Sequence, residues 1–372
     1  MKIGITCYPT YGGSGTVATE LGKALASRGH KVHFISYSLP YRLQKFNENV
    51  SFHEVSMMQY PLFEYPPYSL ALAAKMVEVV ESQDLDLLHV HYAIPHATSA
   101  YLTKQMLEGR PKVITTLHGT DITIVGNDDS YFRITQFSID KSDGITTVSD
   151  FLKKETEKHF NIKTPIEVIH NFVDTNHFRR DRYRCAKSLF ALDNERIVMH
   201  ISNFRPVKRI EDVIFTFAGI NSEVPSKLIM VGDGPLMSTA LRMVNELGVS
   251  DDTLFLGKQS DVAGLLAIAD LYLLPSDKES FGLSALEAQS CSVPVIGANV
   301  GGLPEVIDHG HTGWLVNVGD VKTMAEYGKK LLTDEKLYQE TSEKSRRRVL
   351  KLFSQERIIG LYEQYYEKIM DI

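Results

Sequence analysis

Short apolar runs alternate with amphipathic stretches along most of the chain, beginning with the run at residues 2–7. The runs have the length of buried strands, and the stretches between them carry apolar residues at helical spacing. Such an alternation predicts parallel α/β units, in which each helix connects two strands of one sheet. The predicted strands lie at residues 2–7, 31–37, 87–91, 113–118, 145–148, 196–201, 227–231, 253–256, 271–274 and 293–297.

The alternation lapses between residues 170 and 195, where Asn, Asp, Arg and Tyr replace the apolar periodicity. Because 372 residues exceed what one hydrophobic core usually fills, we place a domain boundary here. The prediction is an α/β protein of two doubly wound, Rossmann-like domains facing a central cleft, at residues 1–170 and 171–353. The tail, residues 354–372, carries Ile358, Leu361, Tyr365 and Ile369 at helical spacing, which predicts a helix with one buried face.

Composition narrows the class of protein. The formal charge is −6 and the basic residues are scattered, which argues against a nucleic-acid partner. The densest basic run, residues 346–348, is interpreted as a solvated helix face. Since no stretch approaches about 18 apolar residues, and the chain enters a strand where a signal peptide would have its apolar core, we expect a cytoplasmic protein without a membrane partner. Cys7, Cys185 and Cys291 are widely spaced, which predicts reduced thiols and neither a disulfide nor a zinc site.

The most informative segment places Glu279 and Glu287 eight residues apart across a strand-to-helix corner. Backbone amides at Phe281, Gly282 and Leu283 would begin the helix without partners, which suits a phosphate or a sugar oxygen. Carboxylates beside such amides indicate a nucleotide-sugar site. The alternative is an amphipathic helix with two solvated glutamates.

A second candidate lies in the glycine-rich turn at residues 12–15, between the first strand and a helix expected to begin near Thr16. There the backbone can approach a ligand closely, and Ser14 adds a donor. Dinucleotide binding is a rival interpretation, but the spacing is not Gly-x-Gly-x-x-Gly, and the second strand ends without an acidic residue for a ribose. A purely structural turn is the other alternative.

Two further segments offer polar groups at strand ends. Lys208 and Arg209 begin a helix, where cations are unfavourable, so we expect an anion to compensate them. His118 ends a strand at the edge where doubly wound sheets place ligand contacts, although a structural histidine is the commoner case.

Three nearby histidines, His89, His91 and His96, raise the question of a metal site. No carboxylate or cysteine close to them completes a ligand set. We expect the first two to pack on one face of a strand, and we expect no protein-bound metal.

These motifs resemble those of the retaining glycosyltransferases of family 4, which have the GT-B fold. The segment 279–287 matches the family's Glu-x7-Glu signature, and YGGSG at 11–15, HGTD at 118–121, NFRPVKR at 203–209 and GDGP at 232–235 follow in the family's order. The resemblance covers nearly the whole chain. It implies an acceptor-binding N-terminal domain, a nucleotide-sugar-binding second domain, a last helix that crosses back to the N-terminal domain, and no cofactor.

Within the family, the chain most resembles members that transfer N-acetylglucosamine from UDP-N-acetylglucosamine to L-malate, the first step of bacillithiol biosynthesis. The resemblance implies that Glu279 accepts from donor-sugar hydroxyls and Glu287 from the ribose, with no protein nucleophile or general base. Lys208 matches the lysine that neutralises the donor diphosphate. Asn203 stands where an arginine is usual, so we assign the second charge to Arg205. The implied catalytic set is His118, Arg205, Lys208 and Glu279, and the donor-binding set is Gly13, Ser14, Gly15, Asn203, Arg205, Lys208, Glu279, Phe281, Gly282, Leu283 and Glu287.

For the acceptor, two malate carboxylates need cations or clustered donors. Arg133 is chosen by its place after the His118 corner and for its bidentate fork, with Tyr92 and Thr120 as hydroxyl donors. A dehydrogenase, a non-catalytic nucleotide-sugar-binding module and a transferase with another small-molecule or lipid acceptor are the alternatives. Spacing leaves open the sugar epimer, the nucleotide base and whether the chain forms a homo-oligomer.

Overall fold

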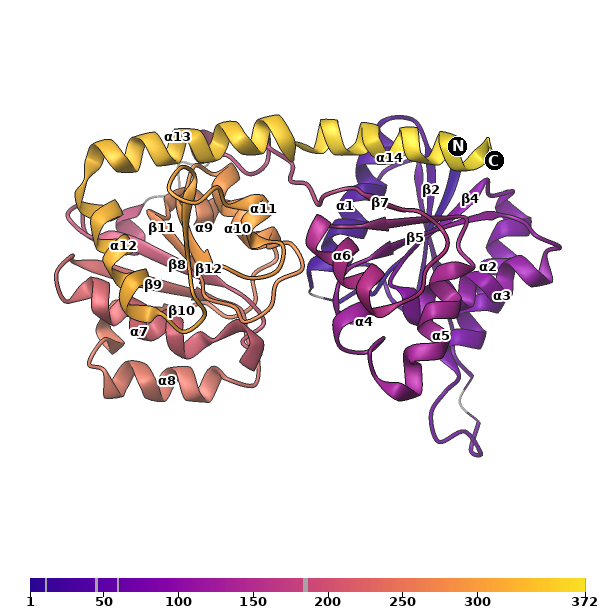
Figure 1. Cartoon of the computed structure of the whole chain (residues 1–372), viewed down its shortest axis with the longest axis horizontal. Helices are drawn as coiled ribbons and strands as arrows, with labels where there is room; N and C mark the ends of the chain where they lie inside the picture. Colours follow the sequence, from indigo (N-terminus) through magenta and orange to yellow (C-terminus); the bar gives the residue numbers. More distant parts are fainter. Residues whose placement is uncertain (11, 44–45, 59, 183–186, 372) are drawn as a thin grey trace. The chain divides into compact units, whose positions relative to one another are not determined.

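The computed structural model of the chain describes residues 1–10, 12–43, 46–58, 60–182 and 187–371 (Figure 1). Two compact units make up the chain: unit 1 is Met1–Asn171 with Glu356–Ile372, and unit 2 is Phe172–Gln355. Of the motif residues named above, Tyr11 and Cys185 lie outside the described residues.

Unit 1 contains a seven-stranded parallel sheet in the order β3-β2-β1-β4-β5-β6-β7. Its strands are β1 Lys2–Thr6, β2 Lys31–Ser36, β3 Val50–Glu54, β4 Leu87–His91, β5 Lys112–Leu117, β6 Gly144–Thr147 and β7 Ile166–Val168. Its helices are α1 Gly13–Ser27, α2 Tyr68–Gln83, α3 Thr98–Met106, α4 Thr120–Thr123, α5 Asp129–Asp140, α6 Asp150–His159 and α14 Gln355–Met370, with an irregular turn at Ala93–Ala97. The strand order reverses between β1 and β4, where doubly wound sheets place their ligands.

Unit 2 contains a six-stranded parallel sheet in the order β10-β9-β8-β11-β12-β13. Its strands are β8 Arg196–Ile201, β9 Ser226–Val231, β10 Thr253–Phe255, β11 Leu271–Leu274, β12 Val295–Ala298 and β13 Gly313–Val316. Its helices are α7 Ile210–Asn221, α8 Met237–Glu246, α9 Ala263–Ile268, α10 Leu283–Ser290, α11 Leu303–Val306, α12 Val321–Thr333 and α13 Glu335–Leu352, with short turns at Arg180–Arg182, Lys187–Leu189, Pro206–Lys208 and Ser250–Asp252. Here the order reverses between β8 and β11.

Each unit has a hydrophobic core formed around the apolar central strands of its sheet. In unit 1, Ile3 and Ile5 of β1 and Leu87 and Leu88 of β4 are fully buried. In unit 2, Val198, Leu228 and Leu271 join Phe217 of α7 in one cluster. Helices cover both faces of each sheet (Figure 1), so the predicted doubly wound α/β architecture is confirmed.

The predicted tail helix is α14, and it packs on unit 1. The hydroxyl of Tyr365 accepts from the backbone amide of Ile145 at 2.9 Å, and the hydroxyl of Tyr366 lies 2.7 Å from Nδ1 of His89. Glu363 forms an ion pair with Arg28 and a hydrogen bond with His30. The prediction that the last helix returns to the N-terminal domain is therefore confirmed.

Burial raises the pKa of the thiols of Cys7 and Cys291 to about 12, as expected of unreactive cysteines. None of the described helices combines the length and the apolar character needed to cross a membrane.

The basic run at residues 346–348 is only in part the solvated face that the sequence predicted. Arg346 donates to the carbonyls of Thr175, Phe178 and Ser290, and Arg348 donates to those of Glu305 and Val306. Only Arg347 is exposed. The other two arginines satisfy backbone carbonyls, which the charge pattern alone could not indicate.

Candidate functional site

The corner between β11 and α10 is built around Gly282. Its φ is 98°, and a Cβ added there would lie 2.4 Å from Cδ2 of Leu303, so both conformation and space require glycine. Within the described part of the chain, the amides of Gly282 and Leu283 donate to no acceptor. They are two of the three amides that the sequence predicted as donors for a phosphate or a sugar oxygen.

Lys208 and Glu279 meet across the point where the sheet of unit 2 reverses its strand order. Nζ of Lys208 lies 2.5 Å from Oε1 of Glu279, and the hydroxyl of Ser276 donates to the same oxygen at 2.9 Å. The side chains are 21% and 12% exposed, so this ion pair is largely shielded from water. Two predicted donor-site residues, 71 positions apart in sequence, are thus in direct contact.

The turn after β8, at residues 203–209, carries two further cations, Arg205 and Arg209. The amide of Leu236, after the GDGP segment, donates to the carbonyl of Phe204 at 3.0 Å, and the amide of Asp277 donates to the carbonyl of Val207 at 2.9 Å. Asn203 and Arg205 are exposed, and Arg205 makes no hydrogen bond or ion pair with a described residue.

Arg209, for which the sequence led us to expect an anionic partner, has two such partners within the protein. It pairs with Asp212 at 2.6 Å and with Asp277 at 3.3 Å. The anionic compensation expected for Arg209 therefore comes from the protein itself, because carboxylates lie in the next helix turn and on the β11 corner.

Glu287 lies on the inner side of α10 and is 5% exposed. Burial raises the pKa of Tyr272, and the charges of Glu287 and Glu279 raise it further. Both carboxylates therefore lie close enough to one buried tyrosine to affect its ionisation. The sequence predicted the pair of Glu279 and Glu287. It did not indicate Tyr272, because a tyrosine in an apolar strand such as β11 is typical of a hydrophobic core.

In unit 1, Ser14, Tyr92 and His118 come together at the strand-order reversal. The hydroxyl of Ser14 donates to that of Tyr92 at 3.2 Å, and the ring of Tyr92 stacks on that of His118 with centroids 5.4 Å apart. The sequence assigned Ser14 to donor binding, His118 to the catalytic set and Tyr92 to acceptor binding. The structure places all three in one cluster.

The glycine-rich turn has two different kinds of glycine. A Cβ on Gly15 would lie 2.4 Å from the carbonyl oxygen of Tyr8, so packing requires this glycine. A Cβ on Gly12 or Gly13 would meet no atom within 4 Å. α1 begins at Gly13, three residues before the predicted start at Thr16. Packing within the described chain thus explains Gly15 but not the other two.

A buried carboxylate that the sequence did not assign, Asp121, holds the His118 corner. It accepts from the amides of Ala93, His118 and Gly119 at 3.0, 3.1 and 2.8 Å. Burial raises its pKa, and these three amides oppose that shift. Asp121 is part of the HGTD motif, but the spacing of that motif could not show which backbone groups its carboxylate meets.

The histidines of β4 pack inside unit 1, as predicted. His89 contacts the hydroxyls of Tyr366 and Thr116, each at 2.7 Å, and its ring stacks on that of His91. Nδ1 of His91 lies 2.8 Å from Nε2 of His118. Burial is the main cause that lowers the pKa of His89 and of His118 to about 3, and that of His91 well below its usual range.

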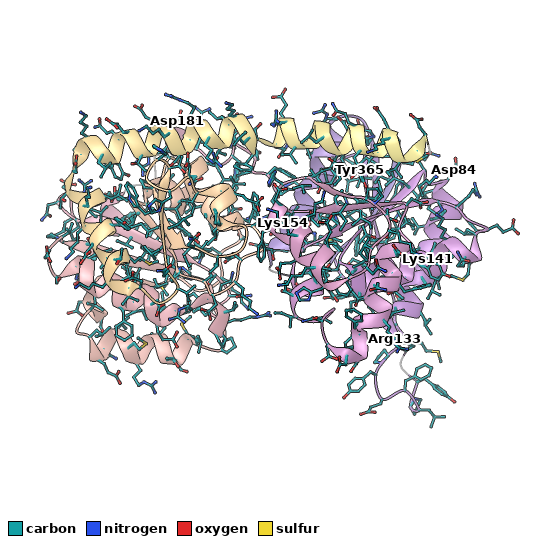
Figure 2. The ribbon with its side chains drawn as sticks, in the orientation of Figure 1. Asp84, Arg133, Lys141, Lys154, Asp181 and Tyr365 are labelled. Atoms are coloured by element: carbon teal, nitrogen blue, oxygen red, sulfur yellow. The ribbon has the colours of Figure 1, made fainter. Side chains whose placement is uncertain are left out.

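The remaining acceptor candidates are exposed. Thr120 is the first residue of α4, and Arg133 lies on α5 (Figure 2). Arg133 makes no hydrogen bond or ion pair with another described residue, so the structure does not bring it into contact with Tyr92 or His118.

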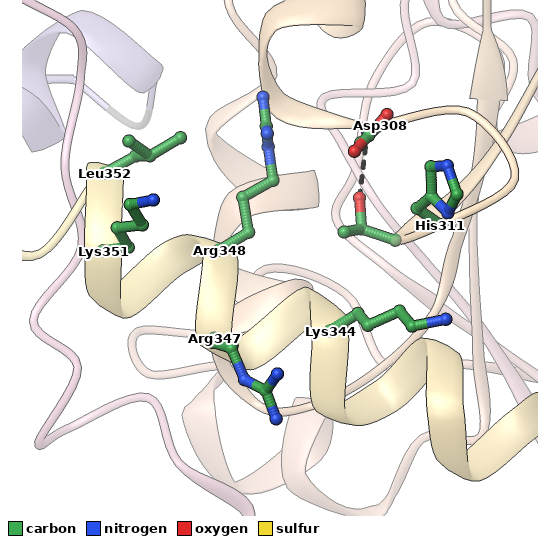
Figure 3. Close-up of a pocket in the computed structure, with 8 residues that line it drawn as sticks. Asp308, His311, Lys344, Arg347, Arg348, Lys351 and Leu352 are labelled. Atoms are coloured by element: carbon green, nitrogen blue, oxygen red, sulfur yellow. Dashed lines mark hydrogen bonds between the residues drawn. The ribbon is translucent and has the colours of Figure 1, made fainter.

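A pocket of about 340 Å³ lies elsewhere in unit 2, along α13 (Figure 3). Its lining contains none of the predicted site residues: Asp308, His311, Thr312, Lys344, Arg347, Arg348, Lys351 and Leu352. Arg348 is already bound to two backbone carbonyls, and Lys344 pairs with Glu340 at 3.4 Å.

Comparison with known proteins agrees with this arrangement. Residues 11–177 match the family model described as Glycosyltransferase Family 4, and residues 184–348 match that described as Glycosyl transferases group 1. Over 373 aligned residues, 100% of this chain and 98% of the relative, the chain is 52% identical to N-acetyl-alpha-D-glucosaminyl L-malate synthase of Bacillus anthracis. It is 35% identical over 198 residues, 50% of this chain and 40% of the relative, to D-inositol 3-phosphate glycosyltransferase of Mycobacterium tuberculosis.

Among solved structures, Anabaena HepE in complex with UDP-glucose is similar in fold, with a TM-score of 0.82 at 19% identity over 100% of both chains. The chain belongs to glycosyltransferase family 4. Its two parallel sheets are the Rossmann-like domains of the GT-B fold.

Proposed function

We propose that this glycosyltransferase moves N-acetylglucosamine from UDP-N-acetylglucosamine to the hydroxyl of L-malate, with retention at the anomeric carbon. The observation that carries the proposal is the 52% identity, over the full length of the chain, to a relative named for that product. The Lys208–Glu279 pair supports it, as do the amides of Gly282 and Leu283, which have no acceptor in the described part of the chain. A diphosphate sugar needs a cation and N–H donors for its phosphates, and acceptors for its hydroxyls.

In this proposal unit 2 holds the donor. Lys208 has three N–H donors, of which Glu279 uses one, so two remain for diphosphate oxygens. Arg205 is exposed and has no ion-pair partner among the described residues, which suits a second contact to the same group. Glu279 accepts from the sugar hydroxyls, and Glu287 accepts from the ribose. A preorganised hydrogen-bond donor such as the ammonium group of Lys208 contributes on the order of 3 kcal/mol to the stability of the transition state.

The chemical step exchanges one bond at the anomeric carbon for another. The bond from that carbon to the diphosphate oxygen breaks, and a bond to the malate hydroxyl oxygen forms on the same face of the sugar. The hydroxyl proton passes to the departing diphosphate, so UDP and the glycoside are the only products. No protein nucleophile is required, and no protein-bound metal, since cations and helix amides stabilise the leaving group.

The acceptor belongs to unit 1 in this proposal. Tyr92 supplies a hydroxyl beside His118, Thr120 supplies another, and Arg133 supplies a charge for one malate carboxylate. Arginine suits this contact because its planar fork binds a carboxylate through two hydrogen bonds.

An alternative within the family is a different acceptor, since a relative of part of this chain is named for inositol phosphate. A non-catalytic nucleotide-sugar-binding module is the alternative outside the enzymes. UDP release from UDP-N-acetylglucosamine, measured with L-malate, inositol phosphate, other hydroxy acids and lipid acceptors in parallel, separates the three. Release that depends on L-malate is the expected result. Release only with another acceptor overturns the malate assignment, and binding without release with any acceptor favours the module.

A further inference from the structure

The contact between His91 and His118 restricts where their protons lie. Nδ1 of His91 and Nε2 of His118 are 2.8 Å apart and buried. Burial lowers the pKa of both rings far below neutrality, so each ring is neutral and carries one proton. One nitrogen of the pair must donate and the other must accept, which leaves two arrangements.

The surroundings of His91 distinguish these arrangements. If His118 donates from Nε2, the proton of His91 must lie on its own Nε2. That nitrogen is buried and has no hydrogen-bond partner among the described residues. A buried N–H group without an acceptor loses its hydrogen bonds to water without compensation, and it is rarer in proteins than an unpaired acceptor.

In the reverse arrangement His91 donates from Nδ1, and only a lone pair is left on its Nε2. His96, in the same cluster, also donates from Nδ1 and leaves Nε2 unprotonated. Nδ1 of His96 lies 2.5 Å from the carbonyl oxygen of His91 and must donate to it, and the buried Nε2 of His96 likewise has no partner in the described structure. His91 in this arrangement repeats the state of His96.

We propose that His91 is a positioning residue that fixes His118 as the tautomer protonated on Nδ1. The inference rests on the proposed function only in naming the ligand. Nδ1 of His118 has no hydrogen-bond partner among the described residues, and His118 as a residue is 9% exposed, with its ring stacked on that of Tyr92. His118 therefore offers an N–H donor to an oxygen of a ligand bound at this edge of the unit 1 sheet. It cannot take the proton of the acceptor hydroxyl through that atom.

The tautomer can be observed without any activity. We would record two-bond ¹H–¹⁵N correlations of the histidine rings in the full-length protein at neutral pH, with His118 assigned by His118→Gln. The expected spectrum has a protonated Nδ1 and an unprotonated Nε2 on His118. A proton on Nε2 of His118 in the wild-type protein would overturn the inference, whether or not the protein transfers a sugar.

Variants separate positioning from simple packing. In His91→Asn the side-chain amide stands close to the place of Nδ1 and can still donate, whereas His91→Leu cannot. His91→Leu should lower kcat about tenfold, equivalent to about 1.4 kcal/mol, and should lose the His118 pattern, with UDP affinity unchanged. His91→Asn should keep the pattern and recover most of the rate.

His33→Leu is the matched control, because His33 is also a buried histidine of unit 1 that contacts a second histidine, His53, at 3.0 Å. It should leave both the His118 spectrum and kcat unchanged. If His91→Leu keeps the wild-type spectrum of His118, or if His33→Leu disturbs that spectrum equally, the assignment to His91 is wrong. An inactive wild-type protein with the expected tautomer would count against the proposed reaction alone.

Discussion

At the residue scale, the donor assignment depends on a charge pair that is already formed without a ligand. Lys208 is held against Glu279 by a 2.5 Å contact, and Ser276 holds the same carboxylate oxygen. Both side chains are therefore preorganised, so little side-chain entropy is lost when a ligand binds.

A first prediction concerns UDP binding. Lys208→Ala and Glu287→Ala should each lower the affinity for UDP roughly ten- to a hundredfold, since a hydrogen bond to a charged group contributes about 1.5–3 kcal/mol. Calorimetric titration with UDP measures this directly. Lys227→Ala is a control, because Lys227 lies at the beginning of β9 and pairs with Asp252 and Glu195 instead of with a predicted site residue. Unchanged UDP affinity in both site variants would contradict the assignment.

Glu279 should behave differently from Glu287. Because its proposed partners are sugar hydroxyls, Glu279→Gln should leave UDP affinity within about threefold while lowering turnover of the full sugar nucleotide about tenfold or more, as loss of about 1.4 kcal/mol requires. Comparing UDP affinity with steady-state turnover tests this. Equal losses in the two measurements would mean that Glu279 serves the nucleotide instead.

The acceptor assignment gives a third prediction. Arg133→Lys keeps the charge but loses the bidentate fork, so it should raise the KM for malate more than that for the donor. The effect should nearly vanish with an acceptor that lacks one carboxylate, because both enzymes then miss the same contact. Wild-type kinetics for malate in Arg133→Lys would move the carboxylate contact to another cation.

At the scale of elements, the predictable features were those with a periodic apolar signal. β4, β8 and β11 have the predicted limits. β3 (Val50–Glu54) was not predicted, because this edge strand is only partly buried and carries Ser, His and Glu. β7 and β13 were also not predicted.

For the candidate site, the sequence likewise indicated the local features and did not indicate the contacts between distant segments. The Glu279 corner and Lys208 could be read from local spacing, whereas their contact depends on β8 and β11 being neighbours. The contact of Asp121 with Ala93 and the contact of His91 with His118 could not be predicted from the sequence, because in each case the partner lies on another element of the fold.

Helix α14 gives a prediction at this scale. Tyr366→Phe removes the hydroxyl that pairs with buried Nδ1 of His89, so the free energy of unfolding should fall by about 1–3 kcal/mol. Urea denaturation followed by circular dichroism measures it. Tyr131→Phe, at a half-exposed tyrosine of α5, should change stability by less than about 0.5 kcal/mol. Equal stability of the two variants would contradict the anchoring role of Tyr366.

At the scale of the whole molecule, the buried histidines link stability to pH. His89, His96, His118 and His200 have pKa values lowered to about 3–4, chiefly by burial, so they are neutral when folded. In the unfolded chain each binds a proton near pH 6.5. Below that pH the unfolded state binds more protons, so stability falls as pH falls from about 6.5 towards 4.

Each of these groups should remove about 1.4 kcal/mol per pH unit over that range. The free energy of unfolding should therefore be several kcal/mol lower at pH 5 than at pH 7.5. Asp121, whose pKa burial raises, acts in the opposite direction but is one group against four. Equal stability at the two pH values, measured by urea denaturation, would show that these histidines are not buried neutral.

The central claim is that one chain joins N-acetylglucosamine to malate with retention, and product analysis tests it most directly. The purified protein would be incubated with UDP-N-acetylglucosamine and L-malate, UDP would be quantified, and the glycoside would be examined by NMR. The account predicts equal amounts of UDP and of an α-linked N-acetylglucosaminyl malate joined through the malate hydroxyl. A β-linked product, a linkage through a carboxylate, or UDP release that does not require malate would contradict it.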